Sequence, residues 1–250
     1  MRQSDTELGG LDRARYEAGS ALEALVRPLV ADPRHGRLPV LLVGLTVVTG
    51  LVDAVSILRL GRVFVANMTG NIVFLGFAAT GAPGFSLVAS LVAVAGFLAG
   101  AATGGRLVRR GTRGARLLET AAVLEFVLVA VALALVAWVG LPAPLATTST
   151  VAGLLALAMG IQNAVARHLA VPDLTTTVLT MALTGFAADP SDHPRERKAL
   201  SVIAMFGGAV LGAVLVMHGQ TSAALSVAAG LLLTVAAVSR TTSNPHPHTA

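Results

Sequence analysis

The residues of this chain best suited to chemistry lie inside apolar sequence. Asp53 stands in the apolar run 39–60, and the next run contains the stretch "VFVANMTGNIVFLG" (63–76). The centre of that stretch holds four residues that are polar or weaken a helix: Asn67, Thr69, Gly70 and Asn71. A carboxylate at the centre of a bilayer costs about 2.5–3.5 kcal/mol, so Asp53 requires a partner or a function.

Two interpretations of Asp53 follow from its position. In the first it is a proton or cation site, because ionisable groups at membrane depth are typical of ion pathways. In the second it is a structural acid that hydrogen-bonds to Asn67, Asn71 or an arginine. The matching position in the second half of the chain is Asn163, which does not titrate. An acid in one half and an amide in the other favour a single coupling ion.

The polar residues around Gly70 have the same two interpretations. In one interpretation they pack within a buried, broken helix and form hydrogen bonds with its free backbone groups. In the other Gly70 opens the helix, and the freed backbone groups line a substrate or ion site. The residues expected to face this site from the second half are Gln162, Asn163, Thr176 and Thr180. Glu125 is a second candidate proton carrier, unless it only pairs with a neighbouring helix.

The composition indicates a membrane protein. Of the 250 residues 54% are hydrophobic and 12% are charged, whereas a soluble domain carries about 25% charged residues. Six apolar runs approach the ~20 residues that cross a bilayer: 39–60, 85–108, 117–139, 146–166, 199–217 and 221–238. Two runs, 63–80 and 174–188, are shorter and more polar.

The basic residues favour six crossings. If all eight runs crossed the membrane, the 18 Arg and Lys would divide ten to eight between its two sides. If the two short runs return to the side they came from, sixteen lie on the side of the N-terminus and only Arg59 and Arg62 lie opposite. Because Arg and Lys concentrate in cytoplasmic loops, we expect both termini in the cytoplasm and re-entrant or broken short runs.

The two halves of the chain repeat each other weakly. "GLVDAV" (50–55) matches "GIQNAV" (160–165), and "GAATG" (100–104) matches "GAVLG" (208–212), with a short Thr-bearing run between the two motifs of each half. With three crossings per half, the second half must be inverted relative to the first. Inverted repeats with short interrupted segments at matching positions are typical of transporter binding sites.

The motifs "DAVSILRLGRVFVANMTGN" (53–71) and "GIQNAVARHLAVPDLTTTVLT" (160–180) resemble the YoaK-type family of bacterial integral membrane proteins, a domain of unknown function. The resemblance covers roughly residues 38–238. It implies a protein of the inner membrane, and it brings no settled substrate or reaction. Met181 follows Thr180 where the family pattern has glycine, so a role for Thr180 equivalent to that of Thr69 is in doubt.

We therefore predict an all-α membrane protein with about six transmembrane helices, two short broken or re-entrant helices and a 3+3 inverted repeat. The expected parts are an amphipathic or disordered cytoplasmic segment (1–38), two membrane repeats (39–139 and 140–238) and a disordered cytoplasmic tail (239–250). The expected function is transport of a small solute across the bacterial plasma membrane, with a proton gradient as the candidate driving force. The alternative is a structural or partner-binding membrane protein.

Several activities are not expected from the sequence. The chain has no His-Glu-x-x-His, no Gly-x-Ser-x-Gly and no paired aspartates in its apolar runs, so we expect no enzymatic activity. We also expect no metal and no cofactor. We expect no nucleic-acid partner, because the arginines flank membrane segments, where they set the orientation of the protein. The lipid bilayer and an unknown small solute are the expected partners.

Overall fold

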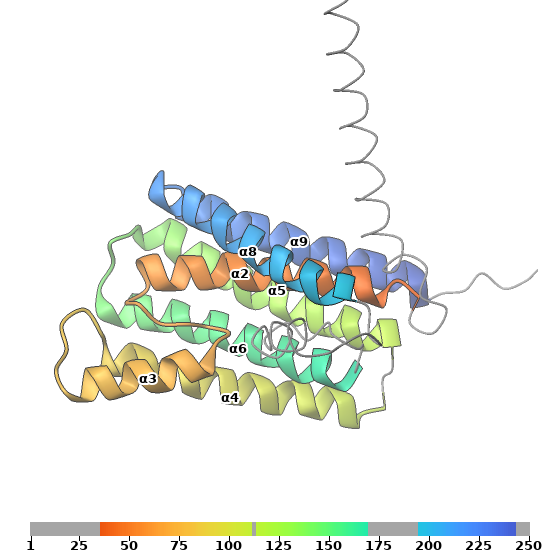
Figure 1. Cartoon of the computed structure of the whole chain (residues 1–250), viewed down its shortest axis with the longest axis horizontal. Coiled ribbons are helices and arrows are strands. Elements are labelled where there is room, and N and C mark those ends of the chain that lie inside the picture. Colours follow the sequence, from red (N-terminus) through yellow and green to blue (C-terminus); the bar gives the residue numbers. More distant parts are fainter. Residues whose placement is uncertain (1–35, 112–113, 170–194, 244–250) are drawn as a thin grey trace, which may run out of the picture.

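The computed structural model of the protein describes residues 36–111, 114–169 and 195–243. They form the seven helices labelled in Figure 1. These are α2 (Leu38–Arg59), α3 (Met68–Ala79), α4 (Leu87–Arg109), α5 (Gly114–Val139), α6 (Leu145–Leu169), α8 (Arg195–Met217) and α9 (Thr221–Ser243). The expected apolar run 174–188, with Thr176 and Thr180, lies outside the described residues.

Six of the helices are long and apolar enough to cross a membrane, and α3, with 12 residues, is not. The predicted all-α membrane fold with six long spans is therefore confirmed. The helix ends differ from the predicted runs by up to five residues. In α9, for example, the helix continues to Ser243 instead of ending at 238. The hydroxyls of Thr241 and Thr242 donate to the carbonyl of Val238 in this added turn, which lets polar residues extend the helix.

The long helices associate in three pairs: α2 with α8, α4 with α6, and α5 with α9. Glycines set the first two pairs. A Cβ added at Gly100 of α4 would overlap the carbonyl oxygen of Leu157 in α6, and one at Gly208 of α8 would overlap that of Val47 in α2. Small residues thus allow close backbone approach, as is common between membrane helices.

The order of these contacts fixes the helix directions. Gly208 and Gly212 of α8 lie against Val47 and Leu51 of α2 in the same order, so α2 and α8 run parallel. By the same criterion α4 and α6 run parallel. Near the start of α5 and the end of α9, Glu119 lies 4.0 Å from Arg240, so these two helices are antiparallel.

The basic residues gather at one end of the helix bundle, which we call the basic end. Helices α2, α5 and α8 begin there, and α4, α6 and α9 end there (Figure 1). Ten described Arg and Lys lie at this end: Arg37, Arg106, Arg109, Arg110, Arg116, Arg167, Arg195, Arg197, Lys198 and Arg240. Arg59 and Arg62 lie at the opposite end.

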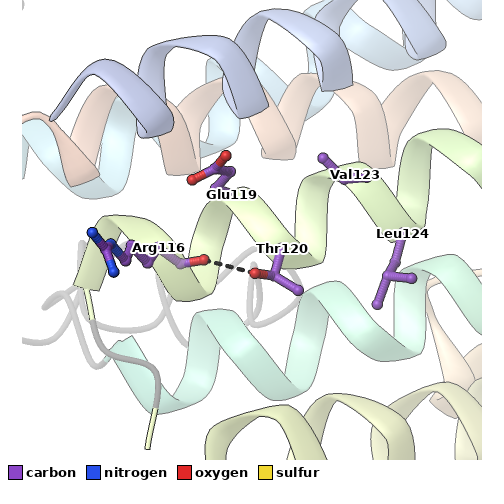
Figure 2. Close-up of a pocket in the computed structure, with 5 residues that line it drawn as sticks. All are labelled: Arg116, Glu119, Thr120, Val123 and Leu124. Carbon is purple, nitrogen blue, oxygen red and sulfur yellow. Dashed lines mark hydrogen bonds between the residues drawn. The ribbon is translucent and has the colours of Figure 1, made fainter. Parts of the chain in front are cut away.

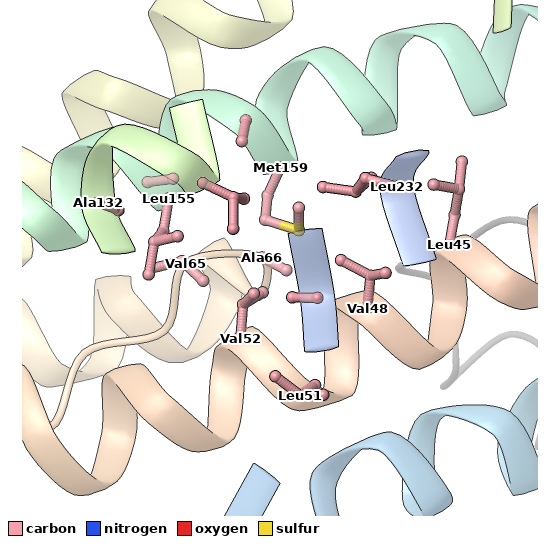
Figure 3. Packing of buried hydrophobic residues seen from close by; sticks show 14 of the residues in the cluster. Leu45, Val48, Leu51, Val52, Val65, Ala66, Ala132, Leu155, Met159 and Leu232 are labelled. Atoms are coloured by element: carbon pink, nitrogen blue, oxygen red, sulfur yellow. The ribbon is translucent and has the colours of Figure 1, made fainter. Parts of the chain in front are cut away.

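The middle of the bundle is a packed apolar core. Figure 3 shows side chains from α2, α5, α6 and α9 in one cluster, among them Leu45, Val52, Met159 and Leu232. Val65 and Ala66, which belong to no helix, also lie in this cluster and are buried. A non-helical stretch of chain therefore reaches the core, and its polar backbone groups need partners there.

Candidate functional site

Residues 60–79 form a re-entrant segment. From the end of α2 the chain runs into the bundle without forming a helix, and α3 then returns it to the same end (Figure 1). Both ends of the segment lie near the start of α4. Gly61 faces Ala89, and the guanidinium of Arg62 lies beside Gly84. The structure thus agrees with the re-entrant or broken element expected for 63–80.

The local sequence explains where α2 stops. Gly61 and Arg62 have φ angles of +93° and +55°, which lie in the left-handed region. Glycine adopts that region at no steric cost and commonly ends helices in it. The chain then continues as "VFVAN" (63–67), in which the β-branched Val63 and Val65 favour an extended backbone over a helix.

Asp53 holds the tip of the re-entrant segment. Its Oδ1 accepts hydrogen bonds from the backbone N–H groups of Val65 (2.9 Å) and Ala66 (3.0 Å). Its Oδ2 is buried and has no hydrogen-bond partner among the described residues. Asp53 precedes the last residue of α2 by six positions, so this contact lies about 9 Å inside that end of the helix at 1.5 Å per residue.

Asn71 ties the extended residues to α3. Its Oδ1 accepts from the N–H of Phe64 at 2.8 Å, and its Nδ2 donates to the carbonyl of Phe64 at 2.6 Å. The amide therefore pairs with one peptide unit as a neighbouring strand would. Asn71 is fully buried, whereas Ile72 and Val73, next to it in α3, are exposed. These two side chains therefore present an apolar surface that suits lipid.

Gly70 does not open the helix, contrary to the expectation from sequence. It is the third residue of α3, and the break in the helix lies before Met68. The reason is steric, because a Cβ at Gly70 would come within 2.6 Å of the Phe64 ring. Gly70 thus allows the extended residues to pack on α3, where the Phe64 ring also stacks on Phe74 at 5.5 Å.

Asn67 and Thr69 lie at the N-terminus of α3 with exposed side chains. Asn67 caps the helix by accepting from the N–H of Gly70 at 3.4 Å. The first N–H groups of a helix lack partners within it and carry partial positive charge. This helix terminus, with an exposed amide and an exposed hydroxyl, follows directly on the buried Val65 and Ala66.

The residues of α6 lie beside α2. Gln162 is buried, and its Nε2 donates to Thr49 Oγ1 (2.7 Å) and to the Leu45 carbonyl (3.4 Å). Its Oε1 has no hydrogen-bond partner within the described ranges. Thr49 precedes Asp53 by one helical turn, so Gln162 contacts α2 about 6 Å from Asp53 along the helix axis. Asn163 donates to the carbonyl of Met159 at 3.0 Å.

The contacts therefore unite part of the predicted site. Asp53, Asn67 and Asn71 meet around residues 64–67, and Gln162 lies one turn away along α2. Glu125 is fully buried in α5, and neither of its carboxyl oxygens has a hydrogen-bond partner in the part of the chain that the structure describes. Sequence reasoning missed Thr49 as the partner of Gln162, although a threonine in an otherwise apolar helix signals such a contact.

Figure 2 shows a pocket of about 350 Å³ on α5 near the basic end. Arg116, Glu119, Thr120, Val123 and Leu124 line it. Thr120 uses its hydroxyl within the helix, where it donates to the carbonyl of Arg116 at 2.9 Å. Glu125 follows Thr120 by five residues and so projects from another side of α5. The pocket therefore does not open on that acid.

Comparisons with known proteins agree with this architecture. A family model described as "Protein of unknown function (DUF1275)" matches residues 41–238. The chain is also 32% identical over 147 residues to the UPF0700 transmembrane protein YoaK of Bacillus subtilis (strain 168). The aligned region is 59% of this chain and 64% of YoaK, so the chain spans just under two thirds of that relative's length.

No solved structure matches the chain. The family match alone covers most of it and takes in most of each of the six long helices, so the predicted YoaK-type resemblance is confirmed. The chain is a multi-pass membrane protein, and it belongs to the DUF1275 family.

Proposed function

We propose that this protein is a permease for a small polar solute in the bacterial plasma membrane. The observation that carries the proposal is the re-entrant segment, whose backbone enters the core of the bundle and starts α3 there. Non-helical backbone at membrane depth is tolerated where protein surrounds it or a water-filled cavity adjoins it. Helices that begin inside the membrane are typical of transporter binding sites.

The proposed architecture is a pair of inverted halves. Gly50 and Gly160 are 110 positions apart, and the carbonyls that they approach, of Met205 and Phe97, are 108 positions apart. Each glycine also faces a backbone nitrogen, that of Ala209 or Ala101, again 108 positions apart. Corresponding residues thus make corresponding contacts between α2 and α8 and between α6 and α4. This supports a two-fold axis in the membrane plane.

In this proposal the re-entrant segment lines the transport path. Asp53 and Asn71 fix it by hydrogen bonds to the backbone of residues 64–66. The solute site adjoins the N-terminus of α3, where Asn67 and Thr69 offer an amide and a hydroxyl. Rocking one half against the other then exposes this site alternately to the two sides of the membrane.

The proposed orientation places the basic end in the cytoplasm. Ten described Arg and Lys lie at that end and two lie at the other, which is the asymmetry that cytoplasmic loops show. Arg59 and Arg62 then face the outside, and both termini lie inside. The proposal requires no enzymatic activity and no cofactor.

A second candidate, a structural or partner-binding membrane protein, rests on a different observation. Asp53, Asn71 and Gln162 all contact backbone or side-chain groups of the protein itself, which suits residues that only stabilise the fold. In that case the core around Val65 and Ala66 never opens to water. The two candidates therefore differ in whether solute crosses the membrane.

Uptake by purified protein in liposomes tests the proposal. A panel of labelled amino acids, sugars, organic acids and inorganic ions is offered with and without an inward proton gradient. Permease function predicts accumulation of at least one solute above protein-free liposomes, and a loss of this uptake in Thr69→Val at unchanged thermal stability. Uptake equal to that of protein-free liposomes for every solute contradicts it.

A further inference from the structure

Glu125 is a buried acid that has no partner among the described residues. It is 0% exposed, and neither carboxyl oxygen has a hydrogen-bond partner in residues 36–111, 114–169 and 195–243. It lies 11 residues after Gly114 and 14 before Val139 in α5, about 16 Å and 21 Å from the two helix ends. Buried polar groups in native proteins are nearly always paired, and an exception calls for an explanation such as a functional role.

Comparison of α5 with α9 shows what the fold itself needs at this position. The buried positions of the two helices correspond at a spacing of 107 residues. The matching buried pairs are Leu117 with Ala224, Leu118 with Leu225, Ala121 with Ala228, Ala122 with Ala229 and Val129 with Ala236. At the same spacing Glu125 corresponds to Leu232, which is fully buried and apolar. The corresponding position of α9 is thus filled by leucine, without a carboxyl group.

The helices packed against α5 offer no charge at the level of Glu125. The charged residue of α9 among the described residues is Arg240, in the last turn, where it lies 4.0 Å from Glu119. The basic residues of α6, Arg167 and His168, also lie in its last turn. On α4, which touches α5 slightly, the charged residues are arginines near the basic end. Asp53 on α2 faces Val65 and Ala66.

We propose that Glu125 is the proton-binding residue that couples transport to a proton gradient. This inference rests on the proposed permease function. One proton binds to one carboxylate oxygen and cancels its charge, and the same proton leaves when the group meets water on the other side. A hard cation such as Ca²⁺ or Mg²⁺ takes about six or more oxygen ligands, whereas a proton requires one lone pair and suits an acid without neighbouring ligands.

The roles of the two intramembrane acids then differ. Asp53 accepts two backbone hydrogen bonds and fixes the re-entrant segment, so the loss or gain of a proton there disturbs the loop. Glu125 has no described donor to lose, so it exchanges a proton without breaking a hydrogen bond of the protein. The geometry thus separates a positioning acid from a proton-binding acid.

Infrared spectroscopy of the reconstituted protein tests proton binding directly, without a known solute. At neutral pH we expect the carbonyl stretching band of a protonated carboxylic acid in the wild type and in Glu119→Gln, and its loss in Glu125→Gln. Glu119 lies on the same helix in contact with Arg240, so it is the matched control. A band that persists unchanged in Glu125→Gln overturns the inference. If Glu125→Gln does not fold, Glu125→Leu, which copies Leu232, provides the same comparison.

Uptake separates this inference from the proposed function. For a solute that the wild type accumulates, Glu125→Gln is expected to lose accumulation driven by a proton gradient while it retains exchange of labelled for unlabelled solute. Undiminished gradient-driven accumulation in Glu125→Gln overturns the coupling role although the protein is a permease. The protein could instead show a carboxylic-acid band that depends on Glu125 but move no solute. That result would support proton binding by Glu125 and refute the permease function.

Discussion

Asp53 and Asn71 together satisfy four backbone groups of a chain segment that lies deep in the bundle. The N–H groups of Val65 and Ala66 bind Asp53, and both the N–H and the carbonyl of Phe64 bind Asn71. In a helix these groups would satisfy one another. The two side chains thus supply what the missing helical turns do not, and this makes a re-entrant path possible at this point.

Removal of the Asp53 carboxylate should therefore destabilise the protein. Asp53→Ala leaves two buried N–H groups without partners, at about 1–3 kcal/mol each. Asp53→Asn retains an oxygen that accepts both bonds and loses only their charge assistance. We expect melting temperatures followed by circular dichroism in detergent to fall in the order wild type, Asn, Ala. Equal melting of Asp53→Ala and wild type would show that the carboxylate does not hold the segment.

Substitution of the two asparagines of the segment should lower the stability of the protein by different amounts. Asn71→Ala leaves the N–H and the carbonyl of Phe64 unpaired in the interior, at about 1–3 kcal/mol each. Asn67→Ala removes an exposed helix cap whose hydrogen bond is long, 3.4 Å, so it costs at most about 1 kcal/mol. Thermal unfolding of the two variants measures the difference, and a larger loss for Asn67→Ala contradicts the assignment.

The sequence anticipated these residues but not their partners. A carboxylate and several amides in apolar sequence indicate that these groups have polar partners or a function, so Asp53 and Asn71 were identifiable as candidates. The atoms to which they bind are backbone groups of Phe64, Val65 and Ala66, which carry no side-chain signal of their own. For that reason the expected bond between Asp53 and an asparagine or arginine side chain is not among the contacts of Asp53.

At the scale of the elements, close helix contacts depend on a few glycines. In α8 a Cβ at Gly208 would overlap the carbonyl of Val47, whereas one at the adjacent Gly207 would meet nothing within 4 Å. Gly100 in α4 is in the same situation as Gly208, with the carbonyl of Leu157 as its neighbour. Gly96 and Gly104, four residues before and after Gly100, likewise face backbone atoms of Gly153 and Ile161 in α6.

Adjacent glycines provide a matched test of this packing. Gly208→Ala and Gly100→Ala force apart helices in contact, and overpacking of this kind costs about 1–3 kcal/mol. Gly207→Ala adds a methyl group in open space and gains up to about 1 kcal/mol from helix propensity. We expect the first two variants to melt lower than the wild type and the third to melt equally or higher. The reverse order would rule out the α2–α8 contact at Gly208.

The six long helices could be predicted because length and hydropathy alone identify them. The course of the re-entrant segment could not be predicted in detail. The sequence marks Gly70 as the natural place for a break, yet the break falls at Gly61, and Gly70 serves the approach of the Phe64 ring. A single glycine signals either a turn or a close contact, and only the packing around it decides which.

At the scale of the whole molecule, the distribution of arginine gives a topology that single cysteines can test. The chain has no cysteine, so every introduced one reports alone. With the basic end in the cytoplasm, a cysteine at Gly111 reacts with a membrane-impermeant reagent only in opened or inverted vesicles, and one at Gly140 reacts in intact cells. Reaction of the Gly111 variant in intact cells would reverse the proposed orientation.

The central claim is that the core around the tip of the re-entrant segment opens alternately to both sides of the membrane. Labelling of Ala66→Cys by a membrane-impermeant thiol reagent tests it most directly and needs no known solute, since Ala66 is 4% exposed at the tip. A permease predicts slow labelling from each side of the membrane in separate experiments, faster in the absence of Asp53. Complete protection from both sides, with normal labelling at Gly111 and Gly140, would contradict transport and favour a static structural protein.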